Sequence, residues 1–319
     1  MILGIETSCD ETAAALVAED GTIRSSVVAS QADLHARFGG VVPEVASRRH
    51  LELIVPVLRE TLGEAGATLD DVDRVAVTQG PGLIGALLVG LAAAKAIAWA
   101  RGLPLVPVNH LHGHVASLYL GPDALEPPFI CLLASGGHTM LVDVTERGSF
   151  RVIGTTLDDA AGEAFDKGAR LLGLGYPGGA AVDRLARKGD PGAYAFPVAR
   201  VPGLDFSFSG VKTALLYAVR DLPEAELEAR RADLAAGYQR AIVRALVERL
   251  EAAGAGAERV AVVGGVAANS ELRAALPQAR FAPLALCTDN AAMIASAARY
   301  ARAVSYPGYL GLDAYASSG

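Results

Sequence analysis

The feature that most constrains the fold of this chain is an internal repeat of a three-strand pattern. Residues 2–30 read as strand, turn, strand, turn, strand, and residues 129–157 align with them without gaps. Six aligned pairs are identical: Ser8 and Ser135, Thr12 and Thr139, Val17 and Val144, Glu19 and Glu146, Gly21 and Gly148, Arg24 and Arg151. Chance similarity between two amphipathic β-meanders is the alternative, and six identities are only moderately above it. The repeat alone is therefore moderate support for a duplication.

A second pair of similar segments supports the duplication. Asp73-Arg-Val-Ala-Val77 and Glu258-Arg-Val-Ala-Val262 both predict buried strands, and each runs into a Gly-rich turn and then a helical run. The repeated order indicates an α/β fold with a duplicated core. This layout resembles the two-lobed superfamily of actin, Hsp70 and the sugar kinases (ASKHA), whose nucleotide lies in a cleft between the lobes. We expect lobe I to comprise residues 1–108 and 292–319, and lobe II residues 109–291.

Two histidines give the clearest chemical signal. His110 and His114 are four residues apart, a spacing that places both on one face of a helix, where they can bind one metal ion. A zincin-type protease also needs a glutamate directly after the first histidine, and that position is Leu111. The spacing therefore predicts a metal site without the protease's base. Two histidines on an ordinary helix or loop are the alternative. His112 lies about 200° around the helix from His110 and is not expected to join the ion.

The composition excludes several other classes. The chain has 319 residues, of which 52% are hydrophobic, so it can bury a large core. Its three scattered cysteines predict a reducing compartment without a disulfide framework. An acidic residue, Glu6, close to the start argues against a signal peptide, and Lys95 interrupts the apolar stretch 83–100. We therefore expect a cytoplasmic protein with no membrane partner.

The net charge of −7 means that contact with nucleic acid requires a local basic patch or a helper protein. The candidate basic residues are Arg48, Arg49, Lys212, Arg230 and Arg231. Solvated surface charges are the alternative interpretation. The segment 188–209, rich in Pro and Gly, reads as an ordered surface loop or lid, or as a plain connector.

Motifs distributed along the whole chain resemble those of one family. They are Gly4-Ile-Glu-Thr-Ser-Cys-Asp-Glu-Thr12, Gly40-Val-Val-Pro-Glu-Val-Ala-Ser-Arg48, Thr78-Gln-Gly-Pro-Gly-Leu83, the histidine pair, Ser135-Gly-Gly-His138, Gly162-Glu-Ala-Phe-Asp-Lys167, Tyr176-Pro-Gly-Gly179, Phe206-Ser-Phe-Ser-Gly-Val-Lys212 and Cys287-Thr-Asp-Asn290. In this order they resemble the bacterial branch of the TsaD/Gcp family, the tRNA N6-adenosine threonylcarbamoyltransferases. The chain departs from the family at His112, where an acidic residue is usual. That histidine could instead add positive charge near a phosphate.

The resemblance implies a metal site of three ligands. His110, His114 and Asp289 would hold one metal ion, iron or zinc, with coordination positions left open for substrate. Asp289 also stands directly before a predicted helix over 291–303, so a role as the N-cap of that helix is the alternative, and both roles can coexist.

The resemblance also implies a substrate site for threonylcarbamoyl-AMP, at which ATP, ADP or AMP could bind too. Its residues would be Leu133, Ala134, Ser135, Gly136, Gly137, Asp166, Gly179, Asp183 and Asn269. A Gly-rich turn lets backbone N–H groups approach a phosphate, and carboxylates can accept hydrogen bonds from ribose hydroxyls. The amide of Asn269 can both donate and accept. Ordinary turns, exposed helical carboxylates and a helix cap at Asn269 are the alternatives.

The implied reaction transfers the threonylcarbamoyl group from threonylcarbamoyl-AMP to N6 of adenosine 37 in tRNAs that read codons beginning with A. It forms threonylcarbamoyladenosine (t6A) and releases AMP, while the metal orients the substrate. Asp10 and Glu11 are candidates for the proton acceptor or for positioning, with an ordinary acidic turn as the alternative. The implied partners are the tRNA anticodon loop, a smaller paralogue of the same fold and a P-loop ATPase. A metalloprotease and an ATP-binding regulatory scaffold are the rival functions.

Overall fold

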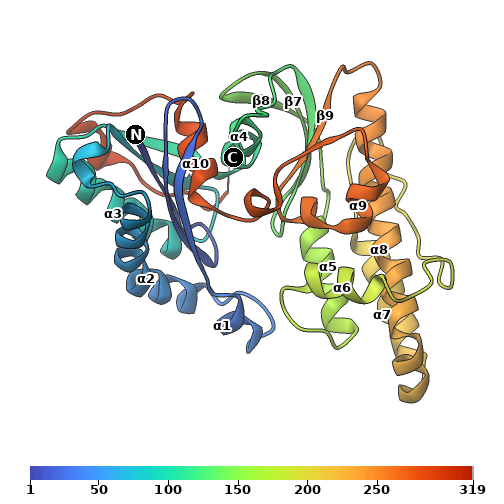
Figure 1. The fold of residues 1–319 in the computed structure, drawn as a ribbon. Coiled ribbons are helices and arrows are strands. Elements are labelled where there is room, and N and C mark those ends of the chain that lie inside the picture. Colours follow the sequence, from blue (N-terminus) through green and yellow to red (C-terminus); the bar gives the residue numbers. More distant parts are fainter. Residues whose placement is uncertain (318–319) are drawn as a thin grey trace. The chain divides into compact units, whose positions relative to one another are not determined.

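The computed structural model describes residues 1–317 and divides into two compact units (Figure 1). Unit 1 comprises Met1–Glu126, Glu146–Ser149 and the C-terminal residues from Thr288, and unit 2 comprises Pro127–Thr145 and Phe150–Cys287. This division differs from the expected boundaries, because residues 109–126 and 288–291 belong to unit 1. The reason is that α4 (His110–Ala116) packs against α10 (Ala291–Ala298) and the strand β5 (Leu105–Asn109) within that unit.

Unit 1 is built on a five-stranded mixed sheet in the order β3-β2-β1-β4-β5. The strands are β1 (Ile2–Glu6), β2 (Glu11–Val17), β3 (Ile23–Ser30), β4 (Arg74–Gly80) and β5 (Leu105–Asn109). The first three form an antiparallel meander, while β4 pairs parallel to β1 and β5 parallel to β4. The helices are α1 (Ala32–Ala36), α2 (Pro43–Glu64), α3 (Ile84–Arg101), α4 and α10.

Helices cover both faces of this sheet, because successive side chains of a strand point to opposite faces. Ile5 packs with Ile54 of α2 and Val89 of α3 in one apolar cluster. Gly4, one residue earlier, lies against Ala291 and Ala295 of α10. The central strand β1 is therefore buried on both sides.

One helix, α3, is long and apolar enough by composition alone to cross a membrane. Its packing accounts for that composition, since it lies against α2 and β4 and buries small and aliphatic residues there. Leu87 and Ala94 are fully buried in this layer. The expectation of a buried core helix at this stretch agrees with these contacts.

Unit 2 repeats the sheet of unit 1. Its order is β10-β9-β6-β7-β8, with β6 and β7 antiparallel and β9 parallel to both β6 and β10. The strands are β6 (Phe129–Ala134), β7 (Thr139–Glu146), β8 (Ser149–Thr155), β9 (Val260–Val263) and β10 (Arg280–Phe281). Read in equivalent order, both sheets place a three-strand meander beside two parallel strands. The predicted duplicated α/β core is therefore confirmed.

The helices of unit 2 are α5 (Ala161–Leu171), α6 (Gly178–Ala186), α7 (Ser209–Arg220), α8 (Glu224–Gly254) and α9 (Ser270–Ala275). Short 3-10 turns occur at Leu69–Asp71, Ser117–Tyr119, Gly265–Ala268, Leu284–Leu286 and Gly308–Gly311. The predicted helix over 291–303 is shorter in the structure, where α10 ends at Ala298. Val304 instead exchanges backbone hydrogen bonds with Leu105 in an antiparallel bridge, so the chain is extended at this residue and not helical.

The close packing of β1 on α10 leads to a stability prediction. Gly4→Ala is expected to lower the free energy of unfolding by about 1–3 kcal/mol, because the added methyl group would collide with the backbone oxygen of Ala291. Gly63→Ala in α2 is a control of opposite sign, since no atom lies near its added methyl group. That change should raise stability by about 0.5–1 kcal/mol. Urea unfolding measures both, and unchanged stability of Gly4→Ala would contradict this packing.

Candidate functional site

The histidine pair is placed by the start of α4. Asn109 ends β5 and caps α4, with its side-chain oxygen accepting hydrogen bonds from the backbone N–H of Leu111 at 2.9 Å and of His112 at 3.3 Å. His110 is therefore the first helical residue and His114 lies one turn later, with the two ring centroids 4.7 Å apart. A methyl group added at Gly113 would lie 2.7 Å from Ile294 of α10, so the glycine permits the close packing of the two helices.

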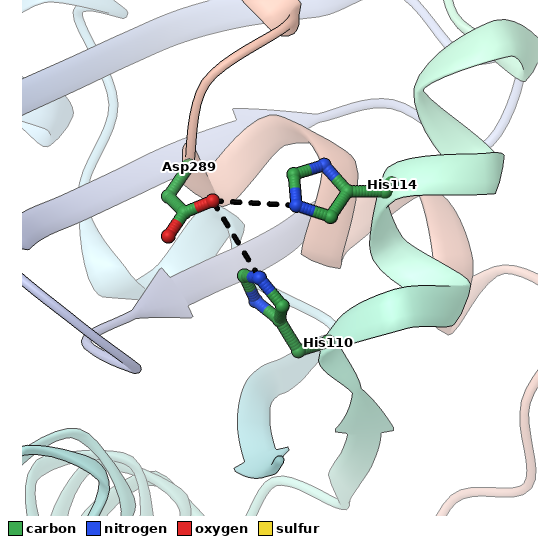
Figure 2. A group of neighbouring side chains, drawn as sticks. All are labelled: His110, His114 and Asp289. Carbon is green, nitrogen blue, oxygen red and sulfur yellow. Dashed lines mark ion pairs between the residues drawn. The ribbon is translucent and has the colours of Figure 1, made fainter. Parts of the chain in front are cut away.

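Asp289 reaches the same place from the segment before α10 (Figure 2). Its Oδ1 lies 3.5 Å from Nε2 of His110 and 3.3 Å from Nε2 of His114. The cap of α10 is the neighbouring Asn290, whose side-chain oxygen accepts from the backbone N–H of Met293 at 2.9 Å. The alternative of Asp289 as this N-cap is therefore wrong, and its carboxylate faces the two imidazoles instead.

These three side chains fit a metal ion. One potential ligand atom from each lies within 4.8 Å of the others, and all three residues belong to unit 1. His114 is fully buried, and neither ring nitrogen has a hydrogen-bond partner. Leaving buried polar atoms without partners is costly, so a buried imidazole of this kind is suited to a ligand that replaces the missing bond. Two imidazole nitrogens and one carboxylate oxygen are the donors that zinc and iron accept.

A second carboxylate, Glu6, holds the other side of His110. Glu6 is fully buried and accepts hydrogen bonds from the backbone N–H of Ser8, from Thr78 Oγ1 at 2.6 Å and from Nδ1 of His110 at 3.0 Å. Burial lowers the pKa of His110, but Asp289 and Glu6 outweigh it and raise the pKa to about 9. Sequence reasoning missed this residue. Its signal is a carboxylate at the end of an otherwise apolar buried strand.

His112 lies outside this cluster. Its Nδ1–H donates to the backbone oxygen of Gly148 at 3.1 Å, within unit 1. Burial lowers the pKa of His112, and this hydrogen bond only partly opposes the effect. The lowered pKa disfavours the charged form of the ring, which argues against the expectation that it adds positive charge near a phosphate.

Asp10 lies at the end of the turn between β1 and β2 in unit 1, and Glu11 is the first residue of β2. Asp10 is buried, whereas Glu11 is half-buried and accepts a hydrogen bond from Ser30 Oγ at 3.2 Å. Burial and the carboxylates of Asp289 and Asp10 raise the pKa of Glu11 well above its ordinary value. Three carboxylates thus act on one another in this unit, which makes Glu11 a better proton acceptor than a free glutamate.

The turn between β6 and β7 in unit 2 presents open backbone. Leu133 and Ala134 are buried strand residues, and Ser135 is held by hydrogen bonds with His138. Gly136 and Gly137 are exposed, and no atom lies within 4 Å of a methyl group added at either. This turn therefore has room for a ligand to approach the main chain.

Asp166 and Gly179 lie beside the start of α6. Asp166 Oδ1 accepts from the backbone N–H of Gly178 at 2.8 Å, which ties α5 to α6. Gly179 has open space, since the nearest atom to an added methyl group is Phe165 Cβ at 3.9 Å. Asp166 thus has a structural role in addition to the predicted one.

Asp183 and Asn269 are brought together at the start of α9. Asp183 accepts a hydrogen bond from Ser270 Oγ at 2.7 Å and pairs with Arg187. Asn269 caps α9 through the backbone N–H of Leu272 at 3.0 Å and donates to Gln239 at 2.8 Å. The cap alternative for Asn269 therefore holds in this structure. Any contact with substrate would come in addition to these bonds.

The duplicated sheets define an α/β protein with a fold of the actin, sugar-kinase and Hsp70 type. Among solved structures, component A of (R)-2-hydroxyglutaryl-CoA dehydratase from Acidaminococcus fermentans matches with a TM-score of 0.55. The match covers 94% of this chain and 96% of that one at 16% sequence identity, so the likeness concerns the fold alone.

Sequence comparisons narrow this class to one family. The TsaD family, tRNA N6-adenosine threonylcarbamoyltransferase, matches residues 22–296. A relative of that name from Symbiobacterium thermophilum is 56% identical over 312 residues, covering 94% of this chain and 91% of the relative. Another from Anaeromyxobacter dehalogenans is 55% identical over 316 residues, covering 94% and 93%. The chain belongs to the tRNA N6-adenosine threonylcarbamoyltransferase family and is a transferase.

Proposed function

We propose that this enzyme transfers the threonylcarbamoyl group of threonylcarbamoyl-AMP to N6 of adenosine 37 in tRNAs that read codons beginning with A. The products are t6A and AMP. The observation that carries the proposal is the cluster of buried His110 and His114 with half-buried Asp289, in a chain whose close relatives bear the transferase name. An orphaned imidazole beside a carboxylate supports a bound metal ion, iron or zinc.

The reaction forms a bond between N6 and the carbamoyl carbon and breaks the bond from that carbon to a phosphate oxygen of the donor. The amine loses a proton, and the bonding electron pair leaves with AMP. The exocyclic amine of adenine is a weak nucleophile, because its lone pair is delocalised into the ring. When bound, the metal would supply Lewis-acid polarisation of a carbonyl or of phosphate oxygens.

The protein's own residues would bind the donor and accept the proton. Open backbone at Gly136 and Gly137 suits a phosphate, and Asp166, Gly179, Asp183 and Asn269 of unit 2 would hold the nucleoside, with Leu133, Ala134 and Ser135 supporting the turn. In unit 1, the raised pKa of Glu11 makes its carboxylate a stronger base, which supports it as the proton acceptor, and the neighbouring Asp10 contributes to that raised pKa.

The proposed setting is the cytoplasm, where the tRNA substrate is available. The proposed partners are a smaller paralogue of the same fold and a P-loop ATPase, and the target adenosine would be presented in the anticodon loop. A base in a loop can enter a pocket without opening a duplex.

The test is direct. The full chain and these partners are incubated with threonylcarbamoyl-AMP and unmodified tRNA, and the nucleosides are analysed by mass spectrometry. We expect t6A at position 37 and equimolar AMP. Failure of the wild-type protein to form t6A with fresh donor would refute the proposed function.

A metalloprotease remains the rival that the histidine pair suggests. Leu111 is buried where the catalytic glutamate would stand, and Glu6 is hydrogen-bonded to the Nδ1 side of His110 instead of lying beside the possible metal position. These observations favour the transferase. Peptide hydrolysis that depends on His114 would favour the protease.

The open turn allows a test that separates binding from folding. Gly137→Val is expected to raise the KM for threonylcarbamoyl-AMP by about tenfold or more, because the side chain would occupy the space proposed for phosphate. Stability should change by less than about 0.5 kcal/mol, since no protein atom is near. Gly210→Val at the start of α7 has equally open surroundings and should leave KM unchanged. An unaltered KM in Gly137→Val would exclude the turn from donor binding.

A further inference from the structure

The basic residues expected to meet RNA are each paired with a carboxylate. Arg48 pairs with Glu44, Arg49 with Glu52, Lys212 with Asp159, Arg230 with Asp233 and Arg231 with Glu228. These pairs leave little excess positive charge at any of the five positions. These five positions therefore do not form a strongly basic surface.

A hollow of about 450 Å³ in unit 2 holds such an excess. It lies between α8 and the loop that precedes α7, and its charged lining is Arg200, Arg244, Arg249 and Glu248. Three guanidinium groups against one carboxylate leave two net positive charges. The remaining lining comes from Phe196 and small aliphatic residues of the loop.

Two of the three arginines are engaged with the protein. Arg249 is structural, because its Nε donates to the backbone oxygen of Asp205 at 3.0 Å and one terminal nitrogen to that of Val201 at 2.9 Å. Arg244 uses only its Nε, which bonds to Glu248 at 2.6 Å. The terminal nitrogens of Arg244 therefore remain available as donors.

The third arginine, Arg200, is exposed and makes no hydrogen bond or ion pair with any residue in the described range 1–317. It differs in this respect from Arg230 and Arg231 of α8, which are both paired. The hollow therefore offers hydrogen-bond donors from Arg200 and Arg244, while Arg249 holds the loop backbone at Val201 and Asp205.

We propose that this hollow is a subsite for a backbone phosphate of the RNA substrate, seated between Arg200 and Arg244. Planar guanidinium groups match phosphate oxygens geometrically, and an unpaired arginine loses no existing ion pair on binding. The inference rests on the proposed function for the identity of the RNA. The lining favours RNA backbone over a free nucleotide, because its aromatic residue, Phe196, is already packed against Tyr194 and Tyr238 and is not free to stack on a base.

The test compares two matched double variants of the full chain. Arg200→Gln with Arg244→Gln removes the proposed phosphate donors. The control, Arg302→Gln with Arg220→Gln, removes the same charge from one exposed arginine and from one whose Nε bonds to a neighbouring carboxylate at 2.8 Å. Binding of unmodified tRNA is measured by fluorescence anisotropy across a range of salt concentrations, and urea unfolding checks that all variants are folded.

The Arg200/Arg244 variant is expected to bind tRNA at least about tenfold more weakly at low salt. The slope of log affinity against log salt should become shallower by about 0.7 to 0.9, the value for one lost phosphate contact. The control should match the wild type. An unchanged slope in the Arg200/Arg244 variant, or an equal change in the control, would overturn the inference.

A second set of measurements distinguishes RNA binding from the binding of small anions. It also distinguishes failure of the proposed subsite from failure of the proposed function. Saturable binding of AMP or inorganic phosphate that is lost in the Arg200/Arg244 variant, with tRNA binding unchanged, would assign the hollow to a free anion and overturn the RNA subsite. If the wild-type enzyme forms t6A but the slopes do not differ, the subsite fails and the transferase function stands. If the wild type forms no t6A, the proposed function itself fails.

Discussion

Replacement of His114 by alanine is expected to abolish metal retention and t6A formation together. The side chain is fully buried, Nε2 faces Asp289 Oδ1 at 3.3 Å, and neither ring nitrogen has a hydrogen-bond partner, so the bound ion is its proposed partner. Loss of a residue that only orients a ligand typically costs 10–100-fold in metal affinity, and loss of a ligand itself should cost more than about 100-fold. Metal content after reconstitution with iron or zinc, followed by gel filtration and elemental analysis, measures the first effect.

His112→Ala is the matched control for this experiment. It removes an imidazole from the same helix, but one that donates to the backbone of Gly148 and lies outside the cluster. This variant should keep its metal and its activity. Because truncation of a buried ring leaves a cavity, His114→Gln provides a second variant of closer volume. A folded His114 variant that retains stoichiometric metal would exclude the histidine as a ligand.

Glu6→Gln is expected to weaken metal binding by about 10–100-fold while leaving the three proposed ligands in place. The carboxylate of Glu6 accepts from three donors, and an amide of the same shape offers one oxygen in place of two. If the amide nitrogen faces His110, the ring must accept at Nδ1 and carry its proton on Nε2, the atom that faces Asp289. If it faces Ser8, a buried N–H is left unpaired, at a cost of about 1–3 kcal/mol.

Thr78→Val separates an effect on stability from an effect on metal affinity. It removes one donor to Glu6 and keeps the hydrogen bond from His110. We therefore expect a loss of stability with near-normal metal affinity. Competition with a chromophoric chelator measures the affinity of each variant, independently of transferase activity. Metal affinity in Glu6→Gln equal to that of the wild type would show that Glu6 does not orient His110.

Much of the fold could be predicted from the residues because its signals are local. The alternation of apolar side chains in residues 2–30 and 129–157 predicted the two meanders, and both occur in the structure. The expected boundary at residue 108 differs from the observed division, because α4 follows β5 directly but is held in unit 1 by α10, far along the chain. Boundaries of this kind depend on packing that no local pattern contains.

The residues of the candidate site also differ in whether the sequence could predict them. The spacing of His110 and His114 was sufficient to predict a metal pair, because one helical turn separates them. Asp289 entered only through resemblance to a family, since nothing in the sequence near the histidines points to it. Glu6 was missed altogether, because its role exists only where β1, β4 and the start of α4 meet.

The sequence by itself determined the repeated core, the shared face of the histidine pair and the family, because periodicity, spacing and motif order are properties of neighbouring residues. Only the tertiary structure decided which carboxylates face the histidines and which arginines are paired. Those outcomes depend on burial and on distances between side chains from separate elements, and in a folded chain these set both the charge and the hydrogen-bond partners of each group.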